Sequence, residues 1–506
     1  MTAISTAVGL ERKSRVSGYK IKKGFFDNDT PNLPQIIAIL GEANTANQPD
    51  LITDPYEFTS AEEVGEMYGY GSPLYQMARI LRPRNSSGIG GIPTIIFPQK
   101  SDEAATSTIH EWTVTGSATE NATHYIVING RKTLDFIPYS YSVVKGDTAT
   151  QIASKMADAI NNVLASPVTA VAADAVVTLT TKWSGETSKE LKTRIDFGFR
   201  PAGISYSQTN VTEGAGVVSL ASSLEQFQDT WYTSVINPYG VAALDVLEQF
   251  NGIPDANNPS GRYQGIVFKP FMSFFGTVLD DKDELSAITN DPSRIEQVTN
   301  VICPAPKSEG YSWEAAVNYV TLFARIMQDT PHLDINEKSL PDMPIPDNGL
   351  IGDMSSYENR DFLLKKGCST VVLDRGTYKV QDFVTTYHPE GESPLQYDYC
   401  RNLNLDWNVS FAYQALENLF VKDHVLVQDN QMTDASKSVK PKEWKATVFD
   451  MFDDLGVRAL INDPDFSKGS LNVQISESNP NRFETTFRYK RTGIARIEST
   501  DVEAGF

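Results

Sequence analysis

The five histidines are the first residues to test for chemistry, because histidine can act as a base or a metal ligand near neutral pH. They stand at positions 110, 124, 332, 388 and 424. None lies in an HExxH motif or at metal-ligand spacing from another histidine or a cysteine, so the sequence does not support a zinc site. The three cysteines, Cys303, Cys368 and Cys400, form no CxxC pair. We expect three free thiols, with one structural disulfide as the alternative.

Motifs for nucleophilic catalysis and phosphate binding are also absent. The sequence has neither a GxSxG elbow nor a GxxxxGK[ST] loop. The glycine-rich stretches 68–73 and 86–93 do not complete GxGxxG, and turns explain them better. Acidic clusters at 280–284 and 450–454 hold oxygen ligands that a cation would use, but solvated surface explains them better. We therefore predict no enzyme activity, no catalytic or metal-binding residue and no cofactor.

The charge of the chain excludes one class of partner. Its 44 Lys and Arg against 64 Asp and Glu give a net charge of −20, which is a poor match for a phosphate backbone, so we expect no direct binding to nucleic acid. Residues 1–24 are the exception, with six basic side chains and one acidic one. Such an arm could attract the acidic body of another subunit, and a disordered tail is the alternative.

Membrane insertion and secretion are not expected. No apolar run approaches the about 18 residues of a membrane span, and 32–41 is too short and contains a proline. The N-terminal stretch lacks the continuous apolar region of a signal peptide. We expect a soluble protein that is made in the cytoplasm.

Strand and helix patterns alternate along much of the chain. Residues 33–44 and 91–99 are typical of buried strands, and a helical pattern over 59–82 begins at a capping box of Ser60 and Glu63. The alternation resumes after about residue 216, with strands expected over 231–240, 264–271, 298–306 and 368–374 and helices over 312–329 and 398–420. This order predicts an α/β sheet.

The stretch between about 101 and 212 has a different texture. Asn129-Gly130 between β-rich runs predicts a hairpin turn. A helix is expected over 146–166, and β structure returns over 168–186. We predict a small α+β domain inserted into the α/β chain.

The segment 482–490 alternates more regularly than any other. Apolar or threonine side chains at 483, 485, 487 and 489 share one face, and mostly charged side chains share the other. This is the period of a half-buried strand. A strand so near the end of the sequence either completes the sheet of its own domain or offers an edge to another chain, and both readings are open.

The order of the segments resembles the tail sheath proteins of contractile-tailed bacteriophages, particularly the Mu-like branch. The stretches that carry the resemblance are GDTATQIASKMADAIN, PVTAVAADAVVTLTTKWSGE, VQDFVTTYHPEGES, QYDYCRNLNLDWNVSFAYQALENLF and RFETTFRYKRTGIARIES. The family has an α/β core similar to the subtilisin fold but without catalysis. This sequence agrees, because no histidine precedes a glycine and no Gly-Thr-Ser stretch is present.

The resemblance implies a fold class and a domain order. The fold is an α/β core, subtilisin-like and non-catalytic, with an inserted β-rich α+β domain and extended N- and C-terminal strand arms. The expected divisions are an N-terminal arm (1–24), the first part of the core (25–100), the insertion (101–212), the resumed core (213–390) and a C-terminal sheath domain ending in a strand arm (391–506).

It also implies a function. The chain would be a structural subunit of a contractile phage tail sheath, which polymerises helically around the inner tail tube and contracts to drive the tube through the host envelope for genome ejection. Its partners would be further copies in stacked hexameric rings, the tail tube protein, and the baseplate and tail terminator proteins. Its place would be the virion tail, after assembly in the host cytoplasm. The alternatives are the sheath of a pyocin-like or other contractile injection system, a β-rich adhesin or binding protein, and a degenerate hydrolase.

Two sets of residues follow from the same resemblance. Family members exchange strands between subunits by β-augmentation, which implies that role for Tyr19, Ile21, Lys22, Lys23, Phe483, Thr485, Phe487, Arg488 and Tyr489. A contact with the tube is expected from the lysine cluster Lys437, Lys440, Lys442 and Lys445. The insertion is expected on the outer surface of the sheath.

Overall fold

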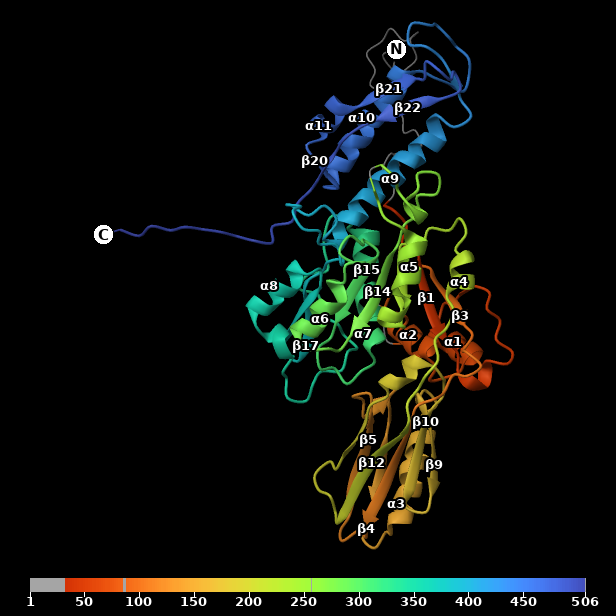
Figure 1. Ribbon diagram of the computed structural model, residues 1–506, viewed down its shortest axis with the longest axis vertical. Coiled ribbons are helices and arrows are strands. Elements are labelled where there is room, and N and C mark those ends of the chain that lie inside the picture. Colours follow the sequence, from red (N-terminus) through yellow and green to blue (C-terminus); the bar gives the residue numbers. More distant parts are fainter. Residues whose placement is uncertain (1–31, 85–87, 256, 506) are drawn as a thin grey trace, which may run out of the picture. The chain divides into compact units, whose positions relative to one another are not determined.

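The computed structural model describes residues 32–84, 88–255 and 257–505, which fall into two compact units (Figure 1). The larger unit contains Asn32–Phe411, Ala459–Asn462 and the chain from Lys490 on. The smaller unit contains Ala412–Arg458 and Asp463–Tyr489. The chain therefore passes between the units several times rather than completing one before the other.

A six-stranded sheet, in the order β15-β14-β13-β1-β3-β2, forms the centre of the larger unit. Its strands are β1 (Ile37–Glu42), β2 (Tyr56–Glu57), β3 (Thr94–Gln99), β13 (Ser234–Asn237), β14 (Met272–Thr277) and β15 (Asn300–Pro304). Every pairing is parallel except that of the edge strand β2. All six residues of β1 are buried, as expected for a parallel strand covered on both faces. The predicted α/β sheet is confirmed.

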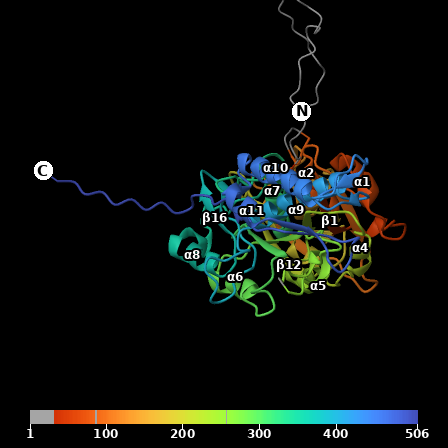
Figure 2. The same cartoon turned by 90° about the horizontal axis from the view of Figure 1, so that it is seen from above.

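Helices cover both faces of this sheet (Figure 2). One side is covered by α2 (Pro73–Leu81) and α7 (Ser312–Asp329), and the other by α4 (Ala221–Glu225) and α5 (Leu244–Asn251). Because side chains of a strand alternate between faces, Ile37 and Ile39 join the apolar cluster of the first side, while Ala38 and Leu40 join that of the second.

The helical pattern expected over 59–82 is two helices, α1 (Ala61–Tyr68) and α2. Gly69 and Gly71 between them have φ of +93° and +89°, outside the helical region. Pro73 then starts α2 behind a Ser72 cap. At the start of α1, Ser60 accepts a hydrogen bond from the backbone of Glu63, but the Glu63 carboxylate accepts from Thr59 instead of the backbone of Ser60. Only half of the predicted capping box forms.

The insertion between β3 and α4 contains two sheets and one long helix. The sheets are β12-β4-β10-β9 and β11-β5-β8, with a two-stranded β6-β7 hairpin. The bounds are β4 (Ile109–Gly116), β5 (Ala122–Ile128), β6 (Thr133–Leu134), β7 (Ile137–Pro138), β8 (Ser140–Val143), α3 (Ala149–Asn161), β9 (Val168–Ala173), β10 (Val176–Thr181), β11 (Thr193–Asp196) and β12 (Ile204–Thr212). The predicted turn is present, with φ of +44° at Asn129 and +74° at Gly130. The capping box of Thr148 and Gln151 is complete.

The larger unit contains further short elements besides the six-stranded sheet, its covering helices and the sheets of the insertion. They are η1 (Thr45–Asn47), η2 (Glu186–Glu190), η3 (Gly240–Ala243), η4 (Gly261–Tyr263), α6 (Lys282–Thr289), η5 (Gly352–Ser355), α8 (Tyr357–Lys365), β16 (Thr370–Asp374), β17 (Thr377–Asp382), β20 (Ile461–Asn462) and β23 (Lys490–Arg491). Helix α9 (Cys400–Phe420) begins in this unit and ends in the smaller one. The three cysteines are free and buried, as predicted.

The prediction of a strand over 264–271 is wrong. These residues form a loop in which Ile266 is fully exposed, and β14 begins only at Met272. The apolar run continues through both stretches, but only the later residues lie opposite β13 and β15. Pro270, which has no N–H to donate, separates the two parts.

The smaller unit packs a helix on a two-stranded sheet. Its elements are the end of α9, β18 (Val425–Leu426), β19 (Ser438–Val439), α10 (Pro441–Val457), α11 (Pro464–Ser470), β21 (Asn472–Ile475) and β22 (Phe483–Thr486). Trp444 and Phe452 of α10 are buried. The ring of Phe487 lies 5.2 Å from that of Phe452 and 5.4 Å from that of Tyr413 of α9. No helix among the described residues is long and apolar enough to span a membrane.

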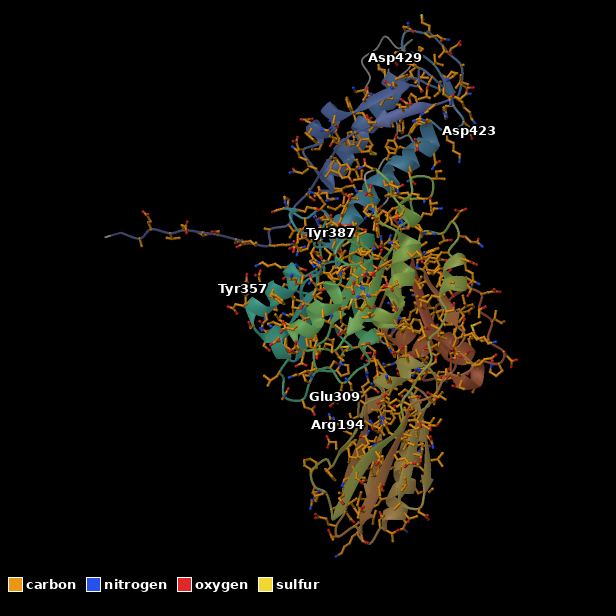
Figure 3. The ribbon with its side chains drawn as sticks, viewed as in Figure 1. Arg194, Glu309, Tyr357, Tyr387, Asp423 and Asp429 are labelled. Carbon is orange, nitrogen blue, oxygen red and sulfur yellow. The ribbon has the colours of Figure 1, made fainter. Side chains whose placement is uncertain are left out.

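Buried polar contacts join the insertion to the α/β core within the larger unit. Arg131, after β5, donates one hydrogen bond to Glu314 of α7 at 2.9 Å and another to the carbonyl of Asp342 at 2.8 Å. The side chain of Glu314 is 1% exposed. Arg194 of β11 lies against Glu309 at 3.0 Å (Figure 3). A buried carboxylate without a partner is costly, so this junction depends on Arg131.

Replacing Arg131 by methionine should cost about 3–5 kcal/mol of the free energy of unfolding, because Glu314 would keep a buried charge without its partner. The double variant Arg131→Met with Glu314→Met should recover most of this loss, since neither charge then remains. Denaturation in urea, followed by tryptophan fluorescence, measures both. The exposed pair Arg200–Glu120 supplies the control, because Arg200→Met should cost under about 1 kcal/mol. Equal effects of the two single variants would contradict the role assigned to Arg131.

Candidate functional site

Three histidines, at positions 110, 124 and 388, are buried and hydrogen-bonded. His124 is fully buried, with Nδ1 2.8 Å from the hydroxyl of Tyr206 and Nε2 3.1 Å from the carbonyl of Arg200. Burial lowers the pKa of its ring. His388 is held between the carbonyl of Thr386 and Asn290. Over residues 32–84, 88–255 and 257–505, no group of His, Cys, Asp and Glu side chains is arranged to hold a metal ion.

The carboxyl ends of the parallel strands, where open α/β sheets usually bind ligands, are occupied by the insertion. Glu42, the last residue of β1, is 1% exposed and accepts a hydrogen bond from Thr187 Oγ1 at 2.8 Å. Thr187 in turn accepts one from the indole of Trp183 at 3.0 Å. A cavity of about 350 Å³ remains beside them, lined by η2, η3 and the end of β14. The usual ligand crevice has thus become a joint between insertion and core.

Two carboxylates lie in this joint away from water. Burial raises the pKa of Glu42 to about 7, although the hydrogen bond from Thr187 opposes the shift. Tyr239, which faces Glu42, has a pKa raised well above its usual value, first by burial. Glu190 of η2 accepts hydrogen bonds from the backbone and the hydroxyl of Ser312 at 2.5 Å, and loss of hydration raises its pKa. Both carboxylates lie between η2 and the core, and we therefore expect the stability of this joint to depend on pH.

The raised pKa of Glu42 predicts a pH-dependent stability. The folded state holds the proton more tightly than the unfolded state, so stability present below about pH 5 is lost as the pH rises towards 7. A shift from 4.5 to about 7 corresponds to about 3 kcal/mol. Glu42→Gln removes the titration, and the variant should therefore gain about 3 kcal/mol over the parent between pH 5 and pH 8.

Urea denaturation of the parent and of Glu42→Gln at pH 5 and pH 8 measures this gain. Tyr239 does not titrate in this range because its pKa is raised. As a second variant, Thr187→Val removes the hydrogen bond that favours the charged form, so it should steepen the pH dependence of the protein. A difference between Glu42→Gln and the parent that is the same at both pH values would contradict the assignment.

The strand expected over 482–490 is shorter than the sequence indicates. Only Phe483–Thr486 forms β22, which pairs antiparallel with β21 of the same chain, with Thr485 opposite Val473. Ser470 interrupts the ladder, because its hydroxyl accepts from the backbone N–H of Arg488 at 2.8 Å and donates to its carbonyl at 3.2 Å. Lys490–Arg491 forms β23, which pairs with β20 in the larger unit. The pairing of β22 with β21 is the one expected if the segment completes the sheet of its own domain.

Five residues assigned to strand exchange belong to the smaller unit, namely Phe483, Thr485, Phe487, Arg488 and Tyr489. Thr485 accepts a hydrogen bond from the indole of Trp444 at 3.1 Å, and Phe487 packs against Phe452 and Tyr489. Arg488 lines a cavity of about 580 Å³ between α11 and the end of β22. Among the described strands, β22 has a neighbour on one edge only. Tyr19, Ile21, Lys22 and Lys23 lie outside the described residues.

The lysines assigned to the tube contact gather at the start of α10. Lys437 and Lys442 are exposed, whereas Lys440 and Lys445 are half-buried. Lys440 is the N-cap residue, and Lys445 lies over the ring of Phe449 at 5.6 Å. Positive charge at a helix N-terminus opposes the helix dipole, so the dipole of α10 does not account for this cluster. The sequence analysis did not predict α10.

An arginine clasp near the C-terminus was also missed. Arg491 binds both carboxylate oxygens of Asp406, at 2.7 and 2.5 Å. Arg401 donates to the backbone and the hydroxyl of Thr492 at 2.7 Å. Arg496 pairs with Asp334 and lies over the ring of Tyr399 at 3.7 Å. The clasp fixes residues 490–496 on the larger unit.

The described residues beyond the clasp leave the larger unit as an extended segment (Figure 1). Ile497 is 91% exposed and Val502 is 81% exposed. The sequence signal for this segment was Arg491 and Arg496, whose acidic partners Asp406 and Asp334 stand 85 and 162 positions earlier in the chain.

No family model matches the chain. The chain is 23% identical over 427 residues to the Mu-like prophage FluMu tail sheath protein of Haemophilus influenzae, and the match covers 82% of each protein. The chain is therefore a relative of a Mu-like tail sheath protein. The resemblance stated from its sequence is confirmed.

Solved structures give a weaker likeness. A sheath tail protein from Desulfitobacterium hafniense matches 94% of this chain and 100% of its own, with 10% identity and a TM-score of 0.44. The helical sheath of the anti-feeding prophage in its contracted state matches 97% of this chain and 99% of its own, with 10% identity and a TM-score of 0.42. Nothing further is inferred from similarity at this level.

Proposed function

We propose that this chain is the structural subunit of a contractile tail sheath. The observation that carries the proposal is the match to a tail sheath protein over 82% of both chains. Four-fifths of the length cannot be a shared module in an otherwise different protein. The contact that covers the carboxyl end of β1 and the hydrogen bonds of the buried histidines support a structural role rather than a catalytic one. Copies of the chain would polymerise helically around an inner tail tube.

We also propose a subtilisin-like core, an inserted domain and strand arms for this chain. A parallel sheet with helices on both faces is compatible with a subtilisin-like core that lacks catalytic residues. In this proposal the insertion at 101–212 lies between two parts of the core, and a C-terminal sheath domain begins at residue 391. The N-terminal arm 1–24 and the extended segment after Arg496 are the proposed strand arms, because residues 483–486 and 490–491 pair within their own chain.

Strand exchange would use edges that this chain leaves open. The outer edge of β22 has no neighbour among the described strands, and the extended segment after Arg496 has no hydrogen-bonded partner there. Backbone hydrogen bonds between such an edge and an arm of another copy would fix the register of two subunits. The body of each subunit could then repack without detaching, as a contracting lattice requires.

Energy for contraction would come from the lattice itself. An extended sheath trapped kinetically above a contracted one releases free energy from every subunit once a baseplate triggers it. No nucleotide is required, in keeping with the missing phosphate loop. Further partners would be the tube and the tail terminator, and assembly would take place in the host cytoplasm before the sheath joins the virion tail. The sheath of a pyocin-like or other injection system remains the second candidate, because the same match supports it.

The protein expressed alone and concentrated at moderate salt should form long striated hollow tubes, which negative-stain electron microscopy detects. Removal of residues 1–24, or of 497–506, should abolish the tubes if these arms link the subunits. Deletion from residue 482 is not a usable test, since it would remove β22 from the smaller unit. Monodisperse particles under all salt conditions would favour the adhesin or binding-protein alternative instead.

Replacing Lys437, Lys440, Lys442 and Lys445 together by alanine should weaken binding to the tail tube at low salt, if their charge faces an acidic tube surface. The effect should fade above about 0.5 M salt, where the Debye length is a few Å. Co-sedimentation of sheath and tube is the measurement. Changing only Lys440 and Lys445, which are half-buried, should have the smaller effect. Unchanged co-sedimentation of the fourfold variant would remove the lysines from the tube contact.

A further inference from the structure

An arginine-lined cavity lies beside α2 and α7 in the larger unit. Its volume is about 510 Å³, and its lining includes Arg79, Arg82, Arg84 and Arg325 together with the exposed ring of Phe136. Such a concentration of guanidinium groups is unexpected on a chain with a net charge of −20. The feature is independent of the strand edges and of the lysine cluster discussed above.

The four guanidinium groups differ in how they are occupied. Arg79 binds Asp135 at 3.3 Å and Asp342 at 3.4 Å, and Arg84 binds Glu62 at 2.6 Å. Arg82 donates to two carbonyls and to the hydroxyl of Thr94. Arg325, which is exposed on α7, makes no hydrogen bond or ion pair with another described residue. Its five donors are open to an incoming acceptor.

The second feature of the cavity is a strained aromatic rim. Phe136 is 77% exposed and has φ of +68°, and its neighbour Asp135 has φ of +47°. A bulky residue in the left-handed region is uncommon and persists only when the surroundings hold it there. Asp135 supplies that hold, because it accepts from the hydroxyl of Tyr75 at 2.6 Å and from Arg79. The cavity therefore presents one open cation beside one fixed apolar ring.

The opposite side of the sheet offers the complementary pair. Asp245, in the first turn of α5, has an 83% exposed side chain, and its partner Arg294 lies at a long 3.7 Å. Val246 next to it is 43% exposed, and Val241 of η3 is 41% exposed. The start of α5 thus combines an open carboxylate with exposed apolar side chains. Figure 2 places α5 across the sheet from α2 and α7.

We propose that a second copy of this chain docks the start of its α5 into the arginine-lined cavity, with Asp245 on Arg325 and Val246 against Phe136. The proposal rests on the assembly role proposed above and names one contact within it. Because the two surfaces lie on opposite sides of one sheet, a docked copy still presents the other surface. The contact is therefore head-to-tail and builds a ring or an open row of subunits instead of stopping at a dimer.

Charge reversal on each side tests the contact. Arg325→Glu and Asp245→Lys should each raise the protein concentration needed for half-maximal self-association at least ten-fold, in sedimentation experiments at low salt. The two changes together in one chain should restore the parent value to within three-fold, because the pair is re-formed with its charges exchanged. Arg375→Glu, which reverses another exposed arginine, in the β16–β17 turn, should leave association unchanged. Circular dichroism of each variant establishes that it is folded.

The outcomes distinguish a failure of the contact between Asp245 and Arg325 from a failure of the proposed sheath function. Single variants that associate like the parent would overturn the proposal, and so would a parent that stays monomeric at every concentration. Failure of the double variant to restore association would show that Asp245 is not the group bound by Arg325. A parent that associates through this pair but forms no tubes would leave the contact standing and contradict the sheath role. Self-association that is insensitive to salt would also exclude an exposed ion pair.

Discussion

Burial of both faces of the parallel sheet is the constraint on which the larger unit depends. Strand β1 has neither a solvent face nor a free edge, so helices must cover it on both sides. Each outer surface of the unit is consequently made by different helices, α2 and α7 on one side and α4 and α5 on the other. Nothing requires these surfaces to carry the same charge, and an arginine cavity can lie opposite an exposed carboxylate. A single subunit thereby gains two different faces without any second domain.

The same sheet decides where the insertion is attached. The chain leaves the core after β3 and returns before α4, and η2 of the insertion covers the carboxyl end of β1. Glu42 is buried there at a cost, visible in its raised pKa, and a hydrophobic residue of equal size would avoid that cost. Its hydrogen bond to Thr187 gives direction to a contact that apolar packing would leave unoriented. Together with the Arg131–Glu314 pair, it ties the insertion to the core of the larger unit.

Features with local causes could be predicted from the sequence. Strand β1 follows from an uninterrupted apolar run, and the turn at Asn129-Gly130 follows from residues that tolerate a positive φ. Helix α3 follows from its capping box. The failures lie where a distant partner decides. The apolar stretch 264–271 looks like β14 but has no strand opposite it. The alternation over 482–490 is real in the sequence, yet Ser470, from another segment, interrupts the pairing.

Candidate sites also could be predicted where their residues are close in sequence, and could not where the residues are far apart. The lysine cluster is visible as letters because its members are close in sequence, and the structure adds only that they start a helix. The cavity around Arg325 could not be predicted, because α2, α7, a hairpin of the insertion and the loop at 341–342 contribute to it from four parts of the chain. The clasp on residues 490–496 likewise depends on partners far earlier in the sequence.

The clasp and the cavity suggest a division of labour among contacts. Arg401, Arg491 and Arg496 anchor the root of the C-terminal segment by bonds with fixed geometry, so a pull on the segment is transmitted to the core of its own subunit. Strand pairing of the segment with another copy would fix register, because a slip of one residue turns every side chain to the wrong face. An exposed ion pair such as that proposed for Arg325 is weaker and tolerates sliding. A lattice that must change its packing without coming apart needs both kinds, the first to keep neighbours joined and the second to be broken and made again.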